Sequence, residues 1–305
     1  MSGERYPIPS RRNALLCVTL LLGLPALLLA AGRVPLWALP GLMIVYAIFM
    51  NTGYSLIHEA EHGLLQEREN LNHFFGAALA LFFPAPYHLL RQGHLGHHLR
   101  NRSDDEAFDL YIPGERKFFK FIQLYGTVSG LYWVLVAACT PVAALHPRLL
   151  KPAWAKFDRT TEAIIESLNP RYDRLIRLEA TAAVLLHGGL IYFGHIPVSR
   201  WLLMGFAFGF TWSAMQYAHH YATVRDVALG ARNLRTFAWL DRLWLNHNWH
   251  LNHHRQPVVP WLHLPALSAP GEVRGSLLQT YLGMWRGPRP AAERVENHYA
   301  GKLIR

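Results

Sequence analysis

Long apolar stretches alternate with polar, basic segments along this chain. The stretches at 14–32 and 36–57 each have about the length of a bilayer-crossing helix, roughly 20 residues. Two shorter stretches, at 179–194 and 200–218, are joined by a tight turn ending in Pro197 and predict a helical hairpin. The pattern therefore predicts an all-α integral membrane protein with four transmembrane helices.

Two other apolar stretches do not fit a full crossing. Residues 74–90 are short and contain two prolines, which favours an interfacial or re-entrant element. Residues 118–145 have basic segments on both sides but are too short for two crossings, so we expect an in-and-out or surface-lying element broken at Pro141. With a cytoplasmic N-terminus, residues 58–178 and 219–305 then form a cytoplasmic helical cap. We expect the whole chain of 305 residues to be a single membrane-embedded domain.

Composition and charge agree with this interpretation. The chain is 51% hydrophobic and 16% charged, whereas soluble domains carry about 25% charged residues. A formal net charge of +10 is also typical of nucleic-acid binding. Basic cytoplasmic flanks of membrane spans explain the charge better, and we expect no nucleic-acid partner. We expect an integral protein of a bacterial inner membrane whose active site faces the cytoplasm.

The first apolar stretch also follows basic residues, as the apolar part of a secretory signal does. It is longer than the roughly 7–15 apolar residues of such signals, and a second span follows almost at once. We therefore interpret it as a span.

Histidine is frequent, with 18 residues, and eight of them form three spaced motifs. Spacings of three and four residues place imidazole rings on one face of a helix, where they can bind a metal ion. A further pair, His219 and His220, ends the last predicted span, and Gln216 precedes His220 by about one turn. The three motifs are His58 and His62; His94, His97 and His98; and His250, His253 and His254.

The number of histidines indicates the kind of metal site. Imidazole ligation suits Zn, Cu, Fe or Ni, but a tetrahedral zinc ion uses three or four protein ligands. Nine imidazoles, counting one from the 219–220 pair, suit two ions of higher coordination with positions left for O2 or water. Carboxylates are expected to orient the ligating imidazoles. The candidates are Glu59, Glu61, Asp104, Asp105, Glu106, Asp109, Asp226 and Asp241.

Two other functions stay open on the residues alone. The sequence His58-Glu59-Ala60-Glu61-His62 fits His-Glu-x-x-His, the zinc-protease pattern in which glutamate is the general base. An intramembrane zinc protease would need one more ligand and would leave most other histidines without a role. A metal transporter would place its ligands midway along the spans.

At these motifs the chain resembles the membrane-bound fatty acid desaturase family, the histidine-box di-iron oxidoreductases. The three motifs match the three boxes of that family, and the resemblance covers roughly residues 51–265. It implies a further ligand at His220, with His219 as the rival, and a water-held amide at Gln216, where asparagine is more usual. The iron ligands that it implies are His58, His62, His94, His97, His98, His220, His250, His253 and His254.

The resemblance also implies a reaction: O2-dependent oxidation of a long fatty acyl chain, by removal of hydrogen from an unactivated C–H bond. The product can be a double bond, a hydroxyl or keto group as in hydroxylases and carotenoid ketolases, or a terminal alkene formed with loss of the carboxylate. The stretches 83–94 and 102–109 look most like the bacterial alkene-forming decarboxylase branch.

The partners implied are a fatty acid or acyl-lipid substrate, membrane lipid and a separate electron donor. We expect the donor to be a ferredoxin-like acidic protein that docks on the basic cytoplasmic face. Arg91 and Gln92, beside the second motif, are candidates for binding a carboxylate head group.

Overall fold

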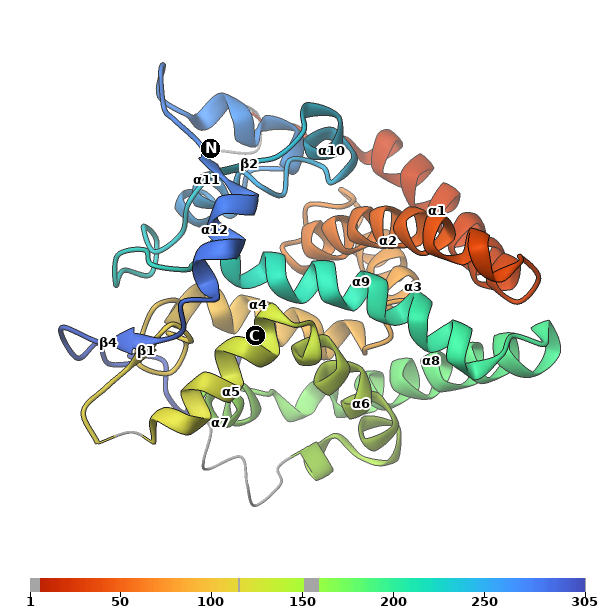
Figure 1. Ribbon diagram of the computed structural model, residues 1–305, viewed down its shortest axis with the longest axis horizontal. Helices are drawn as coiled ribbons and strands as arrows, with labels where there is room; N and C mark the ends of the chain where they lie inside the picture. Colours follow the sequence, from red (N-terminus) through yellow and green to blue (C-terminus); the bar gives the residue numbers. More distant parts are fainter. Residues whose placement is uncertain (1–5, 115, 151–158, 305) are drawn as a thin grey trace.

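The structure is a computed structural model and describes residues 6–114, 116–150 and 159–304. The described chain is mainly helical, with two small sheets of two short strands each. Long helices form one part of the molecule, and the segments after α4 and α9 fold over one end of it (Figure 1).

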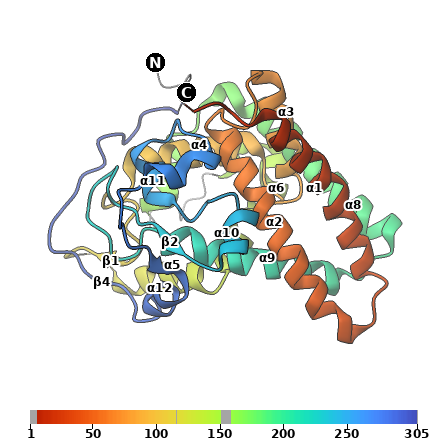
Figure 2. The same ribbon diagram turned by 90° about the horizontal axis from the view of Figure 1, so that it is seen from above.

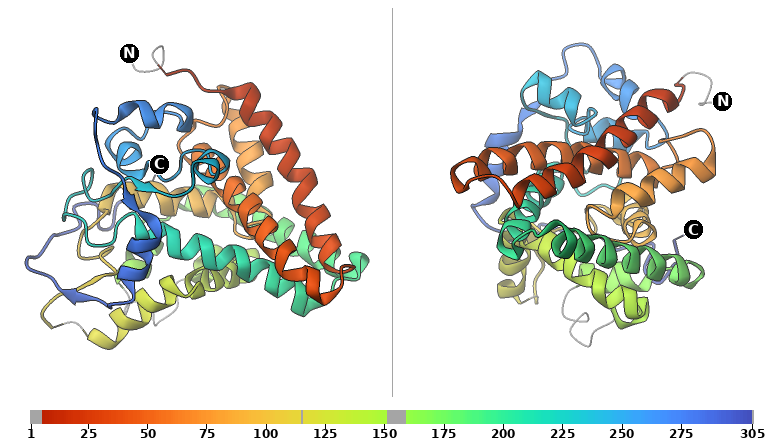
Figure 3. Two further views of the ribbon diagram at one scale, coloured as in Figure 1. Left: turned by 45° about the horizontal axis from the view of Figure 1, so that its top comes forward. Right: turned by 90° about the vertical axis from the view of Figure 1, so that its right-hand side faces the viewer.

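The first two long helices are an antiparallel pair. Helix α1 (Ser10–Ala31) and helix α2 (Leu39–Glu61) are linked by the 3-10 turn η1 (Leu36–Ala38). Helix α8 (Asp173–Gly194) and helix α9 (Val198–Ala218) form the predicted hairpin, because His195 takes a left-handed conformation at the turn. Helix α9 packs against α2, and α8 packs against α6, so that the two pairs form adjacent layers (Figure 3).

Three helical segments of the described chain are long and apolar enough to cross a membrane: Ser10–Ala31, Leu36–Glu61 and Pro170–Gly194. Helix α9 forms where a fourth span was predicted but lies outside this set, since polar side chains such as Gln216 lower its hydropathy. Its neighbours α2 and α6 cover much of it, so it needs less apolar surface toward lipid. The prediction of four spans with a cytoplasmic cap therefore stays a prediction.

The stretch predicted to break at Pro141 breaks elsewhere. Helix α5 (Lys117–Val128) and helix α6 (Leu131–Leu145) meet at an angle of 90°, and Pro141 lies within α6. The bend is at Gly130, whose φ of +89° favours glycine. A Cβ atom there would also lie 2.8 Å from the Cα atom of Phe210. A close approach of two helices thus determines the position of the bend.

The 74–90 stretch consists of parts of two shorter helices. Helix α3 (Glu69–Ala80) and helix α4 (Tyr87–Arg100) are separated by a turn that contains both prolines. Because Pro86 is the residue before α4, this proline begins a helix rather than interrupting one. Helix α4 carries the second histidine motif along its length.

Many of the remaining elements lie around the ends of α2, α4 and α9 (Figure 2), and others pack against α6 and α8. The short helices are α7 (Arg159–Glu166), α10 (Ala238–Leu243), α11 (His250–Arg255) and α12 (Leu277–Met284), with 3-10 turns η2 (Pro147–Leu150), η4 (Pro170–Tyr172) and η5 (Trp261–Leu267). Strand β1 (Leu110–Tyr111) pairs in parallel with β4 (Arg289–Pro290), and β2 (Leu234–Arg235) pairs with β3 (Gly275–Ser276). These pairings hold residues after 275 against loops that lie far earlier in the chain.

Aromatic side chains fill the core between α2, α9 and the turn before α4. Trp212 contacts Tyr54, Phe83 and Tyr132 at ring-centroid distances of 5.5, 4.9 and 5.7 Å. Trp244 and Trp261 are also buried, at 7% and 3% exposure. These two tryptophans therefore belong to the core.

Candidate metal centre

The histidine motifs meet at the end of the helical layers, in two groups. The first group is His58, His62, His94, His98 and His253, and the second is His97, His220, His250 and His254. Within each group the available ring nitrogens all lie within 4.8 Å of one another. All nine histidines named from the sequence are thus brought together, from α2, α4, α11 and the end of α9.

Helical geometry explains how the second and third motifs divide between the groups. Residues turn by about 100° each along a helix, so positions i and i+4 lie close in angle while i+3 points to one side. In α4, His94 and His98 join the first group and His97 joins the second. In α11 the arrangement is reversed: His250 and His254, four residues apart, belong to the second group, and His253 belongs to the first.

The spacing of the nitrogens fits shared coordination of an ion. In the first group, Nε2 of His94 lies 2.8 Å from Nε2 of His62 and 3.1 Å from Nε2 of His98. In the second group, Nε2 of His220 lies 3.1 Å from Nε2 of His250. Two nitrogens bound at about 2.1 Å and at right angles to one metal would be about 3 Å apart. Buried Nε2 atoms of His58 and His254 also lack a hydrogen-bond partner among the described residues.

Histidine binds a metal ion in its neutral form, which burial favours. Burial, together with the charges of Arg91 and His97, lowers the pKa of His62 to about 3. Burial also lowers the pKa of His98 and His253, and contact with other imidazoles adds to the effect. A neutral imidazole keeps one nitrogen lone pair with which it can bind a metal ion.

Two imidazoles are oriented by partners on their Nδ1 atoms. His97 Nδ1 lies 2.6 Å from a carboxylate oxygen of Glu106, whose other oxygen accepts from Arg100 at 2.6 Å. Burial alone would raise the pKa of Glu106, but the charges and hydrogen bonds of Arg100 and His97 lower it to about 2. His220 Nδ1 donates to the carbonyl of Gly230 at 2.9 Å. Each contact fixes the ring and leaves Nε2 free to bind a metal.

The neighbouring histidine is held differently. His219 Nδ1 lies 2.9 Å from the carbonyl of Met215, and its Nε2 lies 3.1 Å from Oδ1 of Asn248. Asn248 in turn donates to Asp241 at 2.8 Å. Both ring nitrogens of His219 therefore contact oxygen atoms of other residues. In His220 only Nδ1 does so, and Nε2 faces the second group.

Gln216 lies one turn before His220, as its spacing predicts. Its Oε1 accepts from Tyr54 at 3.4 Å, and its buried Nε2 has no partner among the described residues. Tyr54 lies beside His58, with ring centroids 6.5 Å apart. An amide ligand role for Gln216 stays a prediction.

The carboxylates named as candidates separate into distinct roles. Glu106 contacts a clustered histidine directly. Glu61 lies 4.0 Å from His94 Nδ1, too far for a hydrogen bond. Glu59 accepts from the backbone N–H of Trp261 at 3.0 Å, which is a structural contact and not the position of a zinc-protease base. Asp241 acts through Asn248 on His219.

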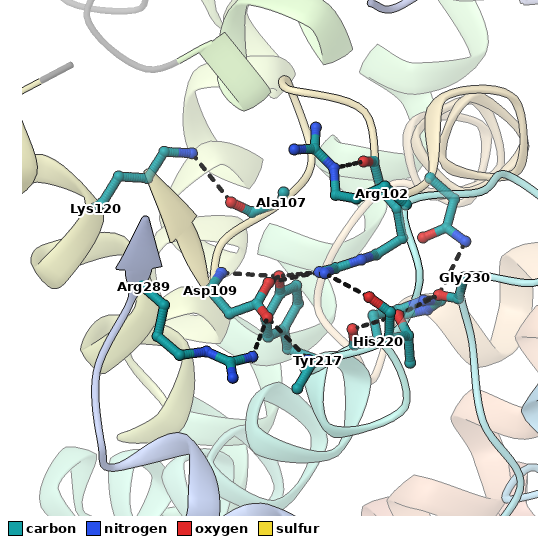
Figure 4. A network of polar contacts seen from close by, with 12 residues as sticks. Arg102, Ala107, Asp109, Lys120, Tyr217, His220, Gly230 and Arg289 are labelled. Atoms are coloured by element: carbon teal, nitrogen blue, oxygen red, sulfur yellow. Dashed lines mark hydrogen bonds and ion pairs between the residues drawn. The ribbon is translucent and has the colours of Figure 1, made fainter. Parts of the chain in front are cut away.

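Asp109 is part of a buried network on the loop that follows the second motif (Figure 4). Arg102 donates to Asp109 at 2.5 Å and to the hydroxyl of Tyr217 at 3.0 Å, and that hydroxyl donates to Asp109 at 2.5 Å. Ala222 N–H donates to the other Asp109 oxygen. Burial opposes ionisation of Asp109, but the charge and hydrogen bonds of Arg102 hold its pKa below the usual value. The network fixes the start of the loop after His220 against the loop after α4.

The third motif lies on a helix of only six residues, and Asn233 holds that helix in place. Its Oδ1 accepts from the N–H groups of Leu251 and Asn252 at 3.0 and 3.2 Å, at the first turn of α11. Its Nδ2 donates to Asn252 Oδ1. Sequence reasoning missed Asn233 and Arg100, because their partners are known only once the chain is folded.

A family model, Fatty acid desaturase, matches residues 34–288, which is most of the chain. The chain belongs to the fatty acid desaturase family. It is also similar to a chloroplastic omega-3 fatty acid desaturase from Glycine max, with 25% identity over 291 residues and 88% of this chain. The alignment covers 59% of that relative's length.

A cleft of about 740 Å³ opens onto the first group of this desaturase-family chain. His62 and His98 form part of its lining, together with α4, the loop after α11 and residues near 300. Neither of the two residues proposed to bind a head group lines it. Gln92 is buried with its amide bonded to His88 O and Asn169 N–H, which removes it as a candidate.

Proposed function

We propose that the nine clustered histidines hold two iron ions and that the protein uses O2 to oxidise a long fatty acyl chain. The two separate imidazole groups carry this proposal. One ion would be held by the five nitrogens of the first group and the other by the four of the second, with Gln216 as a further amide contact. Family membership favours iron over zinc or copper. When bound, such a pair supplies O2 reduction and the oxidising power to break a C–H bond.

The protein's own role is to hold the metal ions, orient the imidazole rings that bind them and exclude water from the substrate cleft. Glu106 and Gly230 fix the rings of His97 and His220. The cleft beside His62 and His98 admits the substrate chain, and apolar walls such as Leu95 and Leu99 exclude water around it. We propose desaturation as the outcome, as the name of the Glycine max relative suggests. Product analysis would distinguish it from hydroxylation or decarboxylation.

We also propose an external ferredoxin-like electron donor. The net charge of +10 favours an acidic partner. Turnover with such a donor should fall as ionic strength rises, and equal turnover at low and high salt would count against this docking mode.

The deciding experiment combines metal analysis with product analysis. Purified protein should contain about two irons, and incubation with O2, reductant and a fatty acid should give an oxidised chain detected by mass spectrometry. His98→Ala and His253→Ala should lose iron and activity, while His146→Ala, outside both groups, should keep both. One zinc per chain, or full activity in His98→Ala, would overturn the proposal.

A further inference from the structure

The cleft above the first histidine group is partly built by residues close to the end of the described chain. Leu95 and Leu99 of α4 form one side, and Val258 follows α11 on another. The remaining wall consists of Tyr299, Lys302, Leu303 and Ile304. The sequence predicts only that this segment belongs to the 219–305 part of the cap, whereas the structure places it against the candidate metal centre.

The segment 291–304, which we name the strap, is anchored at its beginning by the loop after the second motif. Asp104 accepts from Arg294 at 2.5 Å and from Val295 N–H at 3.1 Å, and its own N–H donates to Val295 O at 2.8 Å. Asn297 donates to Asp105 at 2.9 Å. Asp104 itself is only 6% exposed.

The far end of the strap is anchored as well. Ile304 N–H donates to Ser167 O at 2.9 Å, and Asn169 donates to Ile304 O at 3.3 Å. The backbone of Asn169 is fixed in turn by buried Gln92 of α4. The strap is therefore held at both ends against the helix that carries His94 and His98.

Lys302 supplies the charge in this wall. Of the described residues that line the cleft, it is the one with a permanent charge, and no carboxylate is among them. Its Nζ donates to His298 O at 2.9 Å and lies 4.8 Å from the ring centre of Tyr299. An ammonium group beside apolar walls suits an amphiphile with one negative charge. A substrate attached to a phosphorylated carrier would present several negative charges. The single cation in this lining would leave most of those charges without a partner.

We propose that the strap is the third wall of the substrate cleft and that Lys302 binds the carboxylate of a free fatty acid. This inference rests on the proposed function, because it assigns the head group of the same substrate. It places the carboxyl end in the cleft that His62 and His98 also line. The bond that is oxidised then lies close to that end of the chain.

The test is equilibrium binding to the full-length protein with its metal bound and without reductant, with a long saturated fatty acid and its methyl ester as probes. Lys302→Gln should weaken binding of the acid by about two- to fivefold, since an exposed ion pair contributes little, and should leave binding of the ester unchanged. Lys302→Arg should restore most of the acid's affinity. Lys117→Gln, a cation outside the cleft, is the matched control. Lys302 is exposed, so the substitutions should not affect folding.

Equal weakening of acid and ester, or no change for either, would overturn the assignment of Lys302. So would wild-type protein that binds acid and ester with equal affinity. Because binding is measured without reductant, the substrate is not turned over and these outcomes do not depend on the iron chemistry. Failure of the proposed function would instead appear as zinc in place of iron, or as no oxidised product from wild-type protein.

Discussion

Two adjacent histidines at the end of α9 show how hydrogen bonds decide which ring can bind a metal. His219 and His220 are both buried, and their spacing alone does not distinguish them, although the family resemblance favours His220. His219 has oxygen partners on both nitrogens, whereas His220 uses only Nδ1 and turns Nε2 toward His250. The choice between them thus depends on Asn248 and Gly230, which are distant in sequence from any motif.

We therefore expect different metal contents in two alanine variants. His220→Ala should lose about one of two bound ions, because it removes a nitrogen that faces the second group. His219→Ala should keep both ions, because both ring nitrogens of His219 contact oxygen atoms outside the two groups. Metal per chain, measured with chelator titration, tests this. The reverse ranking would make His219 the ligand.

Glu106 should matter more than its neighbouring acids. It is the one candidate carboxylate within hydrogen-bond distance of a clustered histidine among the described residues. Glu106→Gln should weaken metal binding at the second group by about 10- to 100-fold, because an amide orients the imidazole of His97 less strongly than a carboxylate does. Asp226→Asn changes a carboxylate that caps its own loop and should leave metal affinity unchanged. Equal effects of the two substitutions would remove Glu106 from this role.

The histidines named from the sequence lie together in the structure, and their role as metal ligands stays a prediction. The helices around them were predicted less well. Periodicity could show that His94, His97 and His98 share a helix, and all three are in the two groups. It could not place the bend between α5 and α6, because the cause is the approach of Phe210 to Gly130 across a long sequence separation. Pro141, the local signal, is accommodated inside α6.

The bend leads to a prediction about Gly130. Gly130→Ala should destabilise the protein by roughly 1–3 kcal/mol, because alanine is strained at positive φ, and its Cβ would also meet Phe210 Cα at 2.8 Å. Gly188→Ala is the control, since a Cβ in the exposed middle of α8 meets nothing within 4 Å. There alanine should be neutral or slightly stabilising. Thermal unfolding in detergent compares the two, and equal melting temperatures would contradict the argument.

The strap depends on the ionised state of Asp104. Burial opposes ionisation, but hydrogen bonds from Arg225, Val295 N–H and Arg294 outweigh it and lower the pKa of Asp104. A lowered carboxylate pKa stabilises the folded state above the unfolded value of about 3.9 and stops doing so as pH falls below it. The strap should therefore be equally protected at pH 8 and pH 5, and loosen only in stronger acid.

Hydrogen exchange of residues 291–304 measures this directly. Asp104→Asn should lower the protection of the strap at neutral pH, relative to an unfolded chain at the same pH, to a level that wild-type protein reaches only in acid. Glu296→Gln changes an exposed carboxylate of the strap itself and should have no effect. If Asp104→Asn leaves exchange unchanged, the backbone contacts of Val295 and Ile304 alone hold the segment.

Distant parts of the chain converge at the two histidine groups, which predicts how the protein responds to loss of metal. The nine imidazoles come from α2, α4, the end of α9 and α11, and α11 is too short to be stable alone. A bound ion stabilises only the folded arrangement, so its removal lowers stability by mass action. Chelation should lower the melting temperature and increase hydrogen exchange in 219–260, while α1 and α8 stay protected because neither contributes a ligand.

Asn233→Ala in metal-loaded protein should cause part of the same change, since it removes the cap of α11. Uniform loss of protection, including α1, would show that the metal groups stabilise the helical layers and not only the segments folded over them.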